Sequence, residues 1–578
     1  GVKNPPSIGV YEFLQAATYY VKNGGDDNKD GLSDSNAWET ISKVNGVSFS
    51  AGDSVLLKKG DTWRERLNVP TSGSEGSPIT FGAYGTGAKP IISGADVVSG
   101  NWVGVDGNGE YPDNSIDIEP QIVIVDGTAW TKGTVGSLAA EEWGWANVDD
   151  GTLFMGADPA ALVVEAGQRG YCIFNSTRQY IVCDNLHLTA ANTRAYLDEA
   201  GQNIIQNCTV DYSGGTEPTG GGGIYVGING DDSSVLSNIV TEIYGDGIYI
   251  YNNNRVVVRD NLSHSHTGLQ DYNDDCIQFD SANDFICLGN TCHTTTTKNG
   301  IFASGGVGGI VENNYVYDCK AGIKLDQDNI TVRFNTTENN GNYGGIASTS
   351  GGVTGLEIYH NISINDQIGI YIDNATVNIY NNVVYGDGQD RAFRVVSLSG
   401  NVKNNIFVSL SHNQNVMLCN SPGALVMDNN VWWPQGVNAF SYNSSNYNTL
   451  VDYKNGTSQG INSIAQDPLF IDAGNNDFYL LSDSPCMNAG VDVGLSEDFD
   501  GKVISNPPEI GAYELDWLYL GDFTGDGDVG PEDLAVLAEN WLQDNPAIDI
   551  APYLDPDGVI NFKEFWVLAA HWLEGTEL

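Results

Sequence analysis

Residues 222–251, GGIYVGINGDDSSVLSNIVTEIYGDGIYIY, contain the pattern that decides the fold. A Gly-Ile step opens a short alternating strand at Ile224, and the same step opens another at Ile248. A fixed period of roughly 20 to 50 residues is typical of a solenoid, in which each repeat packs on the next. The pattern predicts stacked coils of about 23 residues, with the Gly allowing a tight bend. The Ile of this step recurs at positions 224, 248, 277, 301, 323, 346 and 370.

A second repeated position identifies the kind of solenoid. An Asn stands before another alternating strand in each repeat, so two short strands recur together, as in one coil of a parallel β-helix. Equivalent positions then stack about 4.8 Å apart, and the Asn side chains are expected to form an amide ladder. The crossover rule predicts a right-handed helix. The Asn positions are Asn185, Asn207, Asn238, Asn261, Asn290, Asn314, Asn335, Asn361, Asn382, Asn405 and Asn430.

The composition limits the possible partners. The 578 residues include 25 Lys and Arg against 74 Asp and Glu, a formal net charge of −49. That charge repels nucleic-acid phosphates and anionic membranes, so neither is an expected partner. Carboxylates are also the ligands that Ca²⁺ prefers, and Ca²⁺ is the expected cofactor. No stretch of about 18 apolar residues predicts a membrane span. The nine Cys fit no metal-ligand spacing and are expected to be small core residues.

The C-terminal residues 521–578 contain an internal duplication of a loop followed by an amphipathic helix. Oxygen ligands at loop positions 1, 3, 5, 7 and 12 are the arrangement that wraps Ca²⁺. The second copy departs from that pattern, because Tyr553 occupies position 1. The expected ligands are Asp522, Thr524, Asp526, the Asp528 carbonyl and Asp533 in the first copy, and Asp555, Asp557, Asn561 and Glu564 in the second.

This duplication resembles a dockerin. The resemblance implies docking onto a cohesin-like partner or anchoring at a cell surface, and a calcium-stapled cap without a partner is the alternative. A weaker string, Asp26, Asn28, Asp30 and Gly31, is interpreted as an Asp-rich turn rather than a calcium site.

The segments on either side of the coils also resemble known proteins. Residues 17–100 are similar to the opening of bacterial β-helix polysaccharide lyases and related glycosidases, and DPLFIDAGNNDFYLLSDSPCMNAG with NPPEIGAYEL resembles the closing segment of secreted bacterial β-helix proteins. The resemblance implies a secreted or cell-surface protein. The expected organisation is 1–13 as the tail of a preceding module or a capping strand, 14–160 as the N-terminal cap and first coils, 161–440 as regular coils, 441–516 as the closing segment and 517–578 as the dockerin-like module.

The best candidate for a chemical site is the coil between Asn261 and Asn290, which is longer than its neighbours. Alignment by the repeated Ile stacks Asp246 beneath Asp275, with Asn299 above. Ionised carboxylates that lie this close repel, so a proton, a lysine or a cation must reduce the repulsion. The neighbouring column holds Gly245, Asp274, Lys298 and Lys320.

Two further columns accompany the carboxylates. The residue after the repeated Ile is often aromatic, and it lines either a sugar-binding groove or the core. Two histidines, His264 and His293, occupy adjacent coils and form either a proton-transfer site or a polar ladder. The column after the Ile reads Tyr225, Tyr249, Gln278, Phe302, Lys324, Ala347 and Tyr371.

Two families share parts of this pattern. The run YGDGIYI, NDDCIQF, KNGIFAS and AGIKLD resembles the active-site strands of polygalacturonase-type hydrolases, which implies that Asp246, Asp274 and Asp275 act as acid and base and that Lys324 contacts the substrate. Lys298 and Asn299 stand where that family has Gly-His-Gly.

HTGLQ with NDDCIQF resembles family 9 pectate lyases instead, in which clustered Asp residues hold calcium and a lysine removes a proton. That match makes Asp271, Asp274 and Asp275 ligands and Lys298 or Lys320 the base, although His266 replaces an acidic residue. A non-catalytic carbohydrate-binding or scaffold β-helix is the third alternative. We favour a polysaccharide-cleaving glycoside hydrolase, because a strongly acidic protein repels a polyuronate.

Overall fold

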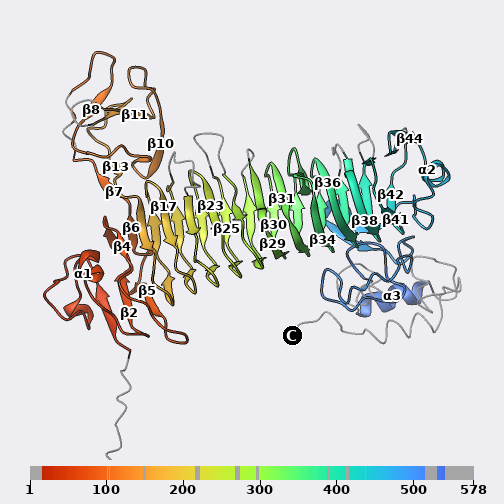
Figure 1. The fold of residues 1–578 in the computed structure, drawn as a ribbon, viewed down its shortest axis with the longest axis horizontal. Coiled ribbons are helices and arrows are strands. Elements are labelled where there is room, and N and C mark those ends of the chain that lie inside the picture. The colour runs from red at the N-terminus through yellow and green to blue at the C-terminus, as the bar shows by residue number, and fades with distance from the viewer. Residues whose placement is uncertain are drawn as a thin grey trace, which may run out of the picture. The chain divides into compact units, whose positions relative to one another are not determined.

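The computed structural model describes residues 16–99, 102, 104–147, 151–214, 222–266, 274–294, 298–386, 391–410, 416–436, 438–514 and 530–540 (Figure 1). The chain divides into two compact units, residues 1–295 and 296–578, which are described separately. None of the described helices has the length and apolar character needed to cross a bilayer.

The described strands of the first unit wind into parallel coils with three strands per turn. The first series is β4 (Leu67–Asn68), β14 (Tyr171–Asn175), β17 (Arg194–Asp198), β20 (Gly222–Val226), β23 (Asp246–Tyr251) and β26 (Ile277–Asp280). The second is β1 (Thr18–Val21), β2 (Ser54–Lys58), β5 (Ile79–Tyr84), β15 (Ile181–Asp184), β18 (Ile204–Gln206), β21 (Ser234–Leu236), β24 (Val257–Arg259) and β27 (Phe285–Leu288). The third is β3 (Thr62–Trp63), β6 (Ile91–Ser93), β16 (His187–Thr189), β19 (Thr209–Asp211), β22 (Ile239–Thr241), β25 (Leu262–His264) and β28 (Thr291–His293).

A separate sheet interrupts the first coils of this unit. Its seven strands pack around Trp143, Leu153 and Met155, all of them buried. They are β7 (Ala95–Val97), β8 (Tyr111–Asp113), β9 (Val123–Val125), β10 (Thr128–Lys132), β11 (Glu142–Ala146), β12 (Thr152–Met155) and β13 (Val164–Gly167). The short helices η1 (Asp34–Asn36) and α1 (Ile41–Asn45) lie earlier in the chain.

The second unit contains the same kind of coil, with longer strands that span two of the three sides. These are β29 (Asn299–Glu312), β31 (Ala321–Arg333), β33 (Gly344–Ser348), β34 (Val353–Tyr359), β36 (Ile368–Tyr380), β38 (Arg391–Lys403), β40 (Met417–Asn420), β41 (Leu425–Asp428), β43 (Phe440–Tyr442) and β44 (Ser445–Tyr447). The third side is formed by β30 (Tyr315–Tyr317), β32 (Thr336–Glu338), β35 (Ile362–Ile364), β37 (Val383–Gly386), β39 (Ile406–Ser409) and β42 (Val431–Trp433). The remaining elements are α2 (Leu450–Thr457), β45 (Phe470–Asp472), η2 (Ala473–Asn475), β46 (Asp477–Leu480) and α3 (Pro531–Glu539).

The register predicted from the repeated Ile is confirmed within each unit. Ile224 pairs with Ile248, and Ile248 pairs with Ile277. In the second unit the same column runs through Ile301, Ile323, Ile346 and Ile370. All of these side chains are buried, so the column forms the interior of the coils. The prediction of two strands per coil was wrong, since each coil has three. The additional strand gives little signal in the sequence, because it is as short as Ser234–Leu236 and only Val235 faces inward.

The Gly of the repeated step has a different role from the one expected. Gly247 does not lie in the left-handed region of φ, so no tight bend requires it. A Cβ at this position would overlap Ser263 Oγ and His266 Nε2. The Gly is therefore needed for close packing inside the coil rather than for the turn.

The amide ladder forms, and each of its members is buried. Asn261 Nδ2 donates to Asn290 Oδ1 at 3.0 Å and to the carbonyl of Val235 at 2.9 Å. Asn261 Oδ1 in turn accepts from Asn238 Nδ2 at 3.0 Å. Buried amides with all partners present resist any shift of one coil against the next. In the second unit the ladder comprises Asn314, Asn335, Asn361, Asn382, Asn405 and Asn430.

Asn185 and Asn207 were wrongly assigned to this ladder. They have φ values of 59° and 52° and lie one position before it, in the left-handed region that Asn tolerates. The ladder position of those coils is occupied by Leu186 and Cys208, and the Cys208 N–H donates to Asn238 Oδ1 at 2.9 Å. The prediction that the cysteines are core residues is confirmed, since all nine are buried and free.

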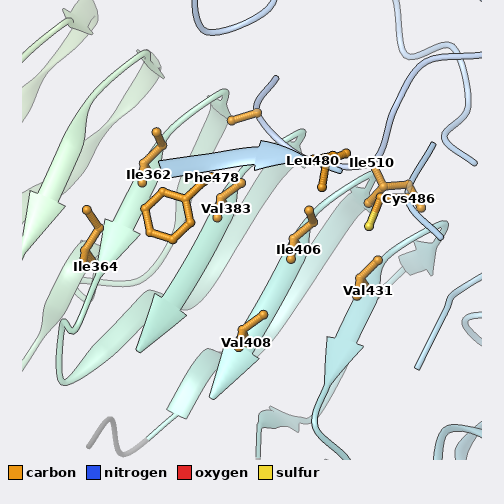
Figure 2. Packing of buried hydrophobic residues seen from close by; sticks show 11 residues of the cluster. Ile362, Ile364, Val383, Ile406, Val408, Val431, Phe478, Leu480, Cys486 and Ile510 are labelled. Carbon is orange, nitrogen blue, oxygen red and sulfur yellow. The ribbon is translucent and has the colours of Figure 1, made fainter. Parts of the chain in front are cut away.

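The end of the second unit covers an apolar outer surface of the coils. Ile362, Val383, Ile406 and Val431 point outward from the third side and are buried under a later segment. Figure 2 shows β46 crossing these strands with Phe478 and Leu480 against them. The main chain of the closing segment also bonds to the turns, as when the Gly511 N–H donates to the Asn404 carbonyl at 2.9 Å.

Removal of a ladder amide tests its contribution. Asn361 Nδ2 donates to Val332 O at 2.9 Å and to Asn382 Oδ1 at 3.0 Å, and Asn361 Oδ1 accepts from Asn335 Nδ2 at 2.9 Å. Asn361→Ala leaves these buried groups unpaired and is expected to cost about 3 kcal/mol in the free energy of unfolding, measured in denaturant. The matched change Asn401→Ala, in the half-buried amide pair with Asn378, should cost less than about 1 kcal/mol. Equal costs for the two variants would contradict a special role of the ladder.

His360 provides a second test. Its ring is buried against Phe334, neither ring nitrogen has a hydrogen-bond partner, and burial lowers the pKa of the imidazole to about 3. The unfolded chain, with a His pKa near its ordinary value of about 6.5, binds the proton more readily than the folded protein. This residue therefore makes the protein lose stability as the pH falls from about 6.5 towards 3.

His360→Phe should raise stability at pH 7 by about 1 kcal/mol and should weaken the loss in acid, because two unpaired buried nitrogens disappear. Phe334 occupies the same turn position one coil earlier with φ 57°, so Phe fits the backbone. Thermal unfolding of both proteins between pH 4 and pH 7 is the measurement. A variant that is less stable at pH 7, or whose stability depends on acid as the wild type's does, would show that the unpaired ring nitrogens do not destabilise the folded protein.

Candidate functional site

The candidate site is the outer face of the first strand series, formed by the outward side chains of β14, β17, β20, β23 and β26. Because Ile248 and Ile250 are buried inside the coil, the alternate residues Tyr249 and Tyr251 point outward. The register lines these side chains up in columns. One column contains Tyr171, Arg194, Gly222 and Asp246, the next contains Phe174, Leu197, Tyr225, Tyr249 and Gln278, and a third contains Tyr251 and Asp280.

Aromatic rings dominate the middle of this outer face. The ring centroids of Tyr225 and Tyr249 are 5.5 Å apart, and those of Tyr249 and Tyr251 are 5.9 Å apart. The Arg194 guanidinium carbon lies 3.6 Å from the centroid of the Tyr225 ring. Tilted rings with a cation over one of them form a rigid surface with both apolar and polar edges. The column after the Ile therefore points away from the interior of the coil here, but its rings are almost covered, with Tyr225 and Tyr249 only 7% and 8% exposed.

The predicted stack of Asp246 and Asp275 is confirmed. The Asp275 N–H donates to Asp246 Oδ1 at 3.0 Å, which joins the two residues across neighbouring coils. Asp246, Asp274 and Asp275 have exposed fractions of 0%, 4% and 2%. They are thus more enclosed than the expected open face. Carboxylates removed from water need partners or a proton, and such environments are typical of functional sites.

Tyr249 connects the rings to a further carboxylate. Its hydroxyl donates to Asp280 Oδ2 at 3.1 Å. Burial raises the pKa of Tyr249, and the nearby negative charges of Asp280 and Asp246 raise it further. The phenol therefore stays protonated and available as a hydrogen-bond donor in this acidic surrounding.

The two predicted histidines form a ladder on a different side of the coil. The rings of His264 and His293 are stacked with centroids 4.6 Å apart and an interplanar angle of 5°. They belong to β25 and β28 of the third series, whereas Asp246 begins β23 of the first series and Asp275 lies two residues before β26. Burial and the neighbouring His293 lower the pKa of His264. This geometry matches the polar-ladder interpretation rather than a proton-transfer site with the carboxylates.

His266, which replaces an acidic residue of the lyase pattern, lies inside the coil. Its Nε2 is 2.8 Å from Ser263 Oγ, and burial lowers the pKa of the imidazole to about 3. This histidine is therefore a neutral core residue. Among the residues that the structure describes, no group of three or more His, Cys, Asp or Glu is placed to hold a metal ion, and Asp271 lies outside them.

Four predicted site residues, Lys298, Phe302, Lys320 and Lys324, lie together in the second unit. Lys324 Nζ is 4.6 Å from the centroid of the Phe302 ring and 2.8 Å from Asp326 Oδ2. Lys320 and Lys324 both approach the ring of Tyr343, at 5.5 and 5.7 Å. Lys298 is half-buried, and its carbonyl accepts from the Lys320 N–H at 2.8 Å. These residues form an outer surface of cations and rings within that unit.

Several residues of the outer face in the first unit were not predicted from the sequence. Arg194 and Tyr171 occupy the same column as Asp246, and Asp280 lies in the column of Tyr251. The coil of Arg194 reads RAYLD, so Tyr196 stands where later coils have Ile, and the Gly-Ile step gives no signal there. In each coil an outward residue stands two positions before the inward one, as Arg194 does before Tyr196. A search at that offset would have found Arg194.

Most of the predicted calcium ligands lie outside the described residues. The exception is Asp533, which is buried at the start of α3 and whose Oδ2 accepts from the Gly530 N–H at 2.7 Å. This bond fixes a carboxylate at the beginning of the helix. Calcium binding by this repeat stays a prediction.

Comparisons with known proteins support the fold of the first unit. Residues 162–286 match the family model described as a right handed beta helix region. This match agrees with the predicted parallel β-helix and its hand, and it includes Arg194, Asp246 and Asp275.

One curated relative is the lacto-N-biosidase of Bifidobacterium longum subsp. longum. It is 37% identical over 92 residues, which cover 15% of this chain and 6% of the relative. The chain therefore matches only a small fraction of the length of that relative.

Solved structures with a similar fold include a complex of XylC with xylose, at 15% identity and a TM-score of 0.40, covering 72% of this chain and 75% of that one. The GH136 lacto-N-biosidase of Eubacterium ramulus has 14% identity and a TM-score of 0.42, covering 72% and 67%. Pectate lyase Pel9A has 14% identity and a TM-score of 0.37, covering 86% and 96%.

Proposed function

We propose that the chain is a carbohydrate-active enzyme that hydrolyses glycosidic bonds on the outer face of its first unit. The observation that carries this proposal is the hydrogen bond between Asp275 N and Asp246 Oδ1, beside the rings of Tyr225 and Tyr249. Neighbouring strands place the Cα atoms of such a pair about 4.8 Å apart. Carboxyl groups about 5 to 9.5 Å apart are those that glycosidases use.

The hydrogen bond that Asp246 accepts is the basis on which we assign roles to the two carboxyl groups. The main-chain N–H of Asp275 donates to Asp246, and such a bond favours the charged form of the acceptor. Asp246 is then the ionised base or nucleophile, and Asp275 is the acid that protonates the leaving oxygen. Asp274, which is adjacent in sequence and also buried, adds negative charge that favours the protonated form of Asp275.

The rings of Tyr225 and Tyr249 are almost covered by their neighbours, so a sugar on this face would contact only their exposed edges. Pyranose rings pack on aromatic side chains, and the Tyr249 hydroxyl, which donates to Asp280, can still accept a hydrogen bond from a sugar. The match to a lacto-N-biosidase is consistent with a glycosidase, although it covers 15% of the chain. Secretion, calcium binding and docking through residues 517–578 belong to the same proposal and come from the sequence pattern.

A substrate screen tests the reaction. Neutral and uronate polysaccharides are incubated with the protein, with and without a chelator, while reducing ends and the ultraviolet absorbance of unsaturated products are followed together. Hydrolysis predicts new reducing ends without absorbance. Asp246→Asn and Asp275→Asn should each lower kcat by about 10²- to 10⁴-fold, the usual contribution of acid and base groups.

The matched control is Asp232→Asn, which alters an exposed carboxylate paired with Arg255 and should leave the rate unchanged. Absorbance that disappears with chelator would replace hydrolysis by a calcium-dependent lyase reaction, with Lys298 or Lys320 as the base. Absence of any product would favour a non-catalytic carbohydrate-binding β-helix.

A further inference from the structure

A separate cleft of about 370 Å³ lies in the first unit, between the third strand series and the inserted sheet. Its floor consists of outward side chains of β3, β6, β16 and β19, and its roof comes from β9 and β13. This volume falls within the range of about 300 to 1,000 Å³ that is usual for small-ligand sites. The lining residues that matter below are Thr62, Arg64, Ile91, Glu165, His187 and Asp211.

Register explains why the floor residues share one side. Thr62 and His187 both pair with Ile91, and Thr189 pairs with Asp211 in the next coil. The intervening residues Ile92, Leu188 and Val210 are buried inside the coil. The roof is set by another pairing, in which Ile124 lies opposite Glu165 in the inserted sheet. The cleft is thus built from two rigid sheets.

The polar groups of the cleft form two pairs. His187 Nε2 is 2.8 Å from Asp211 Oδ2, and Arg64 forms an ion pair with Glu165 across the cleft. Each pair contains one buried polar atom that has no hydrogen-bond partner. These atoms are Asp211 Oδ1 and Arg64 Nε. Buried polar atoms without partners are rare in native proteins and are often satisfied by a ligand or an ordered water. One is an acceptor and the other is a donor.

The charges of the cleft indicate the class of ligand. One guanidinium faces two carboxylates, Glu165 and Asp211, so an anionic ligand would meet more repulsion than attraction. A neutral ligand with several hydroxyl groups can donate to Asp211 Oδ1 and accept from Arg64 Nε. Its apolar side can rest on Ile91, Ile124 and Tyr212, which also line the cleft.

We propose that this cleft is a carbohydrate-binding site for one or two units of a neutral sugar. It is distinct from the outer face of the first strand series and does not depend on hydrolysis there. The carboxylate of Asp211 accepts hydroxyl hydrogens, Arg64 donates to a hydroxyl or ring oxygen, and His187 orients Asp211. A site of this kind would hold a saccharide on the protein without cleaving it.

Saturation-transfer NMR with the whole chain tests the site. The probes are xylose, galactose, N-acetylglucosamine and lactose, with galacturonate as the anionic comparison. At least one neutral sugar should bind, and Asp211→Asn should weaken its binding by about tenfold or more, because a charge-assisted hydrogen bond is lost. Thr62→Phe should block the cleft with a ring. The backbone of Thr62 is held by Asn23, so the fold does not depend on this side chain.

Asp184→Asn is the matched control, since Asp184 lies in the coil of His187, bonds to Asn207 and does not line the cleft. It should bind the probe as the wild type does. No binding of any neutral sugar, or binding of galacturonate alone, would overturn the proposal. Binding that survives both cleft variants but is lost in Tyr249→Ala would assign the sugar to the outer face and would overturn it equally.

Discussion

The stacked asparagine amides are the constraint on which the rest of the structure depends. Each amide bonds to the coil on either side, as Asn261 does with Asn238 and Asn290. A slip of one residue in a parallel strand would exchange inward and outward side chains. It would turn Ile248 outward and Tyr249 inward. Fixing the register at one corner therefore fixes every column of the coil, including those that carry the carboxylates and the rings.

This constraint also explains which parts were predictable from sequence. The repeated Ile and the Asn of the ladder recur at a nearly constant interval, so the stacking of Asp246 and Asp275 followed from counting. Asn185 and Asn207 were misplaced by one position because an Asn also suits the left-handed turn residue before the ladder. The coil of Arg194 was not recognised because Tyr196 replaces the Ile there.

Features that depend on distant segments could not be read from the repeat. The burial of Asp246 and Asp275 depends on side chains of neighbouring coils. The cleft near His187 joins Arg64 to Glu165 across a long stretch of sequence, which includes the whole inserted sheet. No periodic signal links those residues. The same limit applies to Phe478 and Leu480, whose position over the last coils is set by apolar packing (Figure 2).

The proposed hydrolysis requires that the outer face of the first unit, whose side chains are positioned by the register, bind sugar. The most direct test is a crystal structure of the Asp246→Asn variant soaked with neutral oligosaccharides. Sugar density is expected beside the rings of Tyr225 and Tyr249, with a glycosidic oxygen near Asp275. Sugar density on another surface, with these rings uncovered, would contradict hydrolysis on this face.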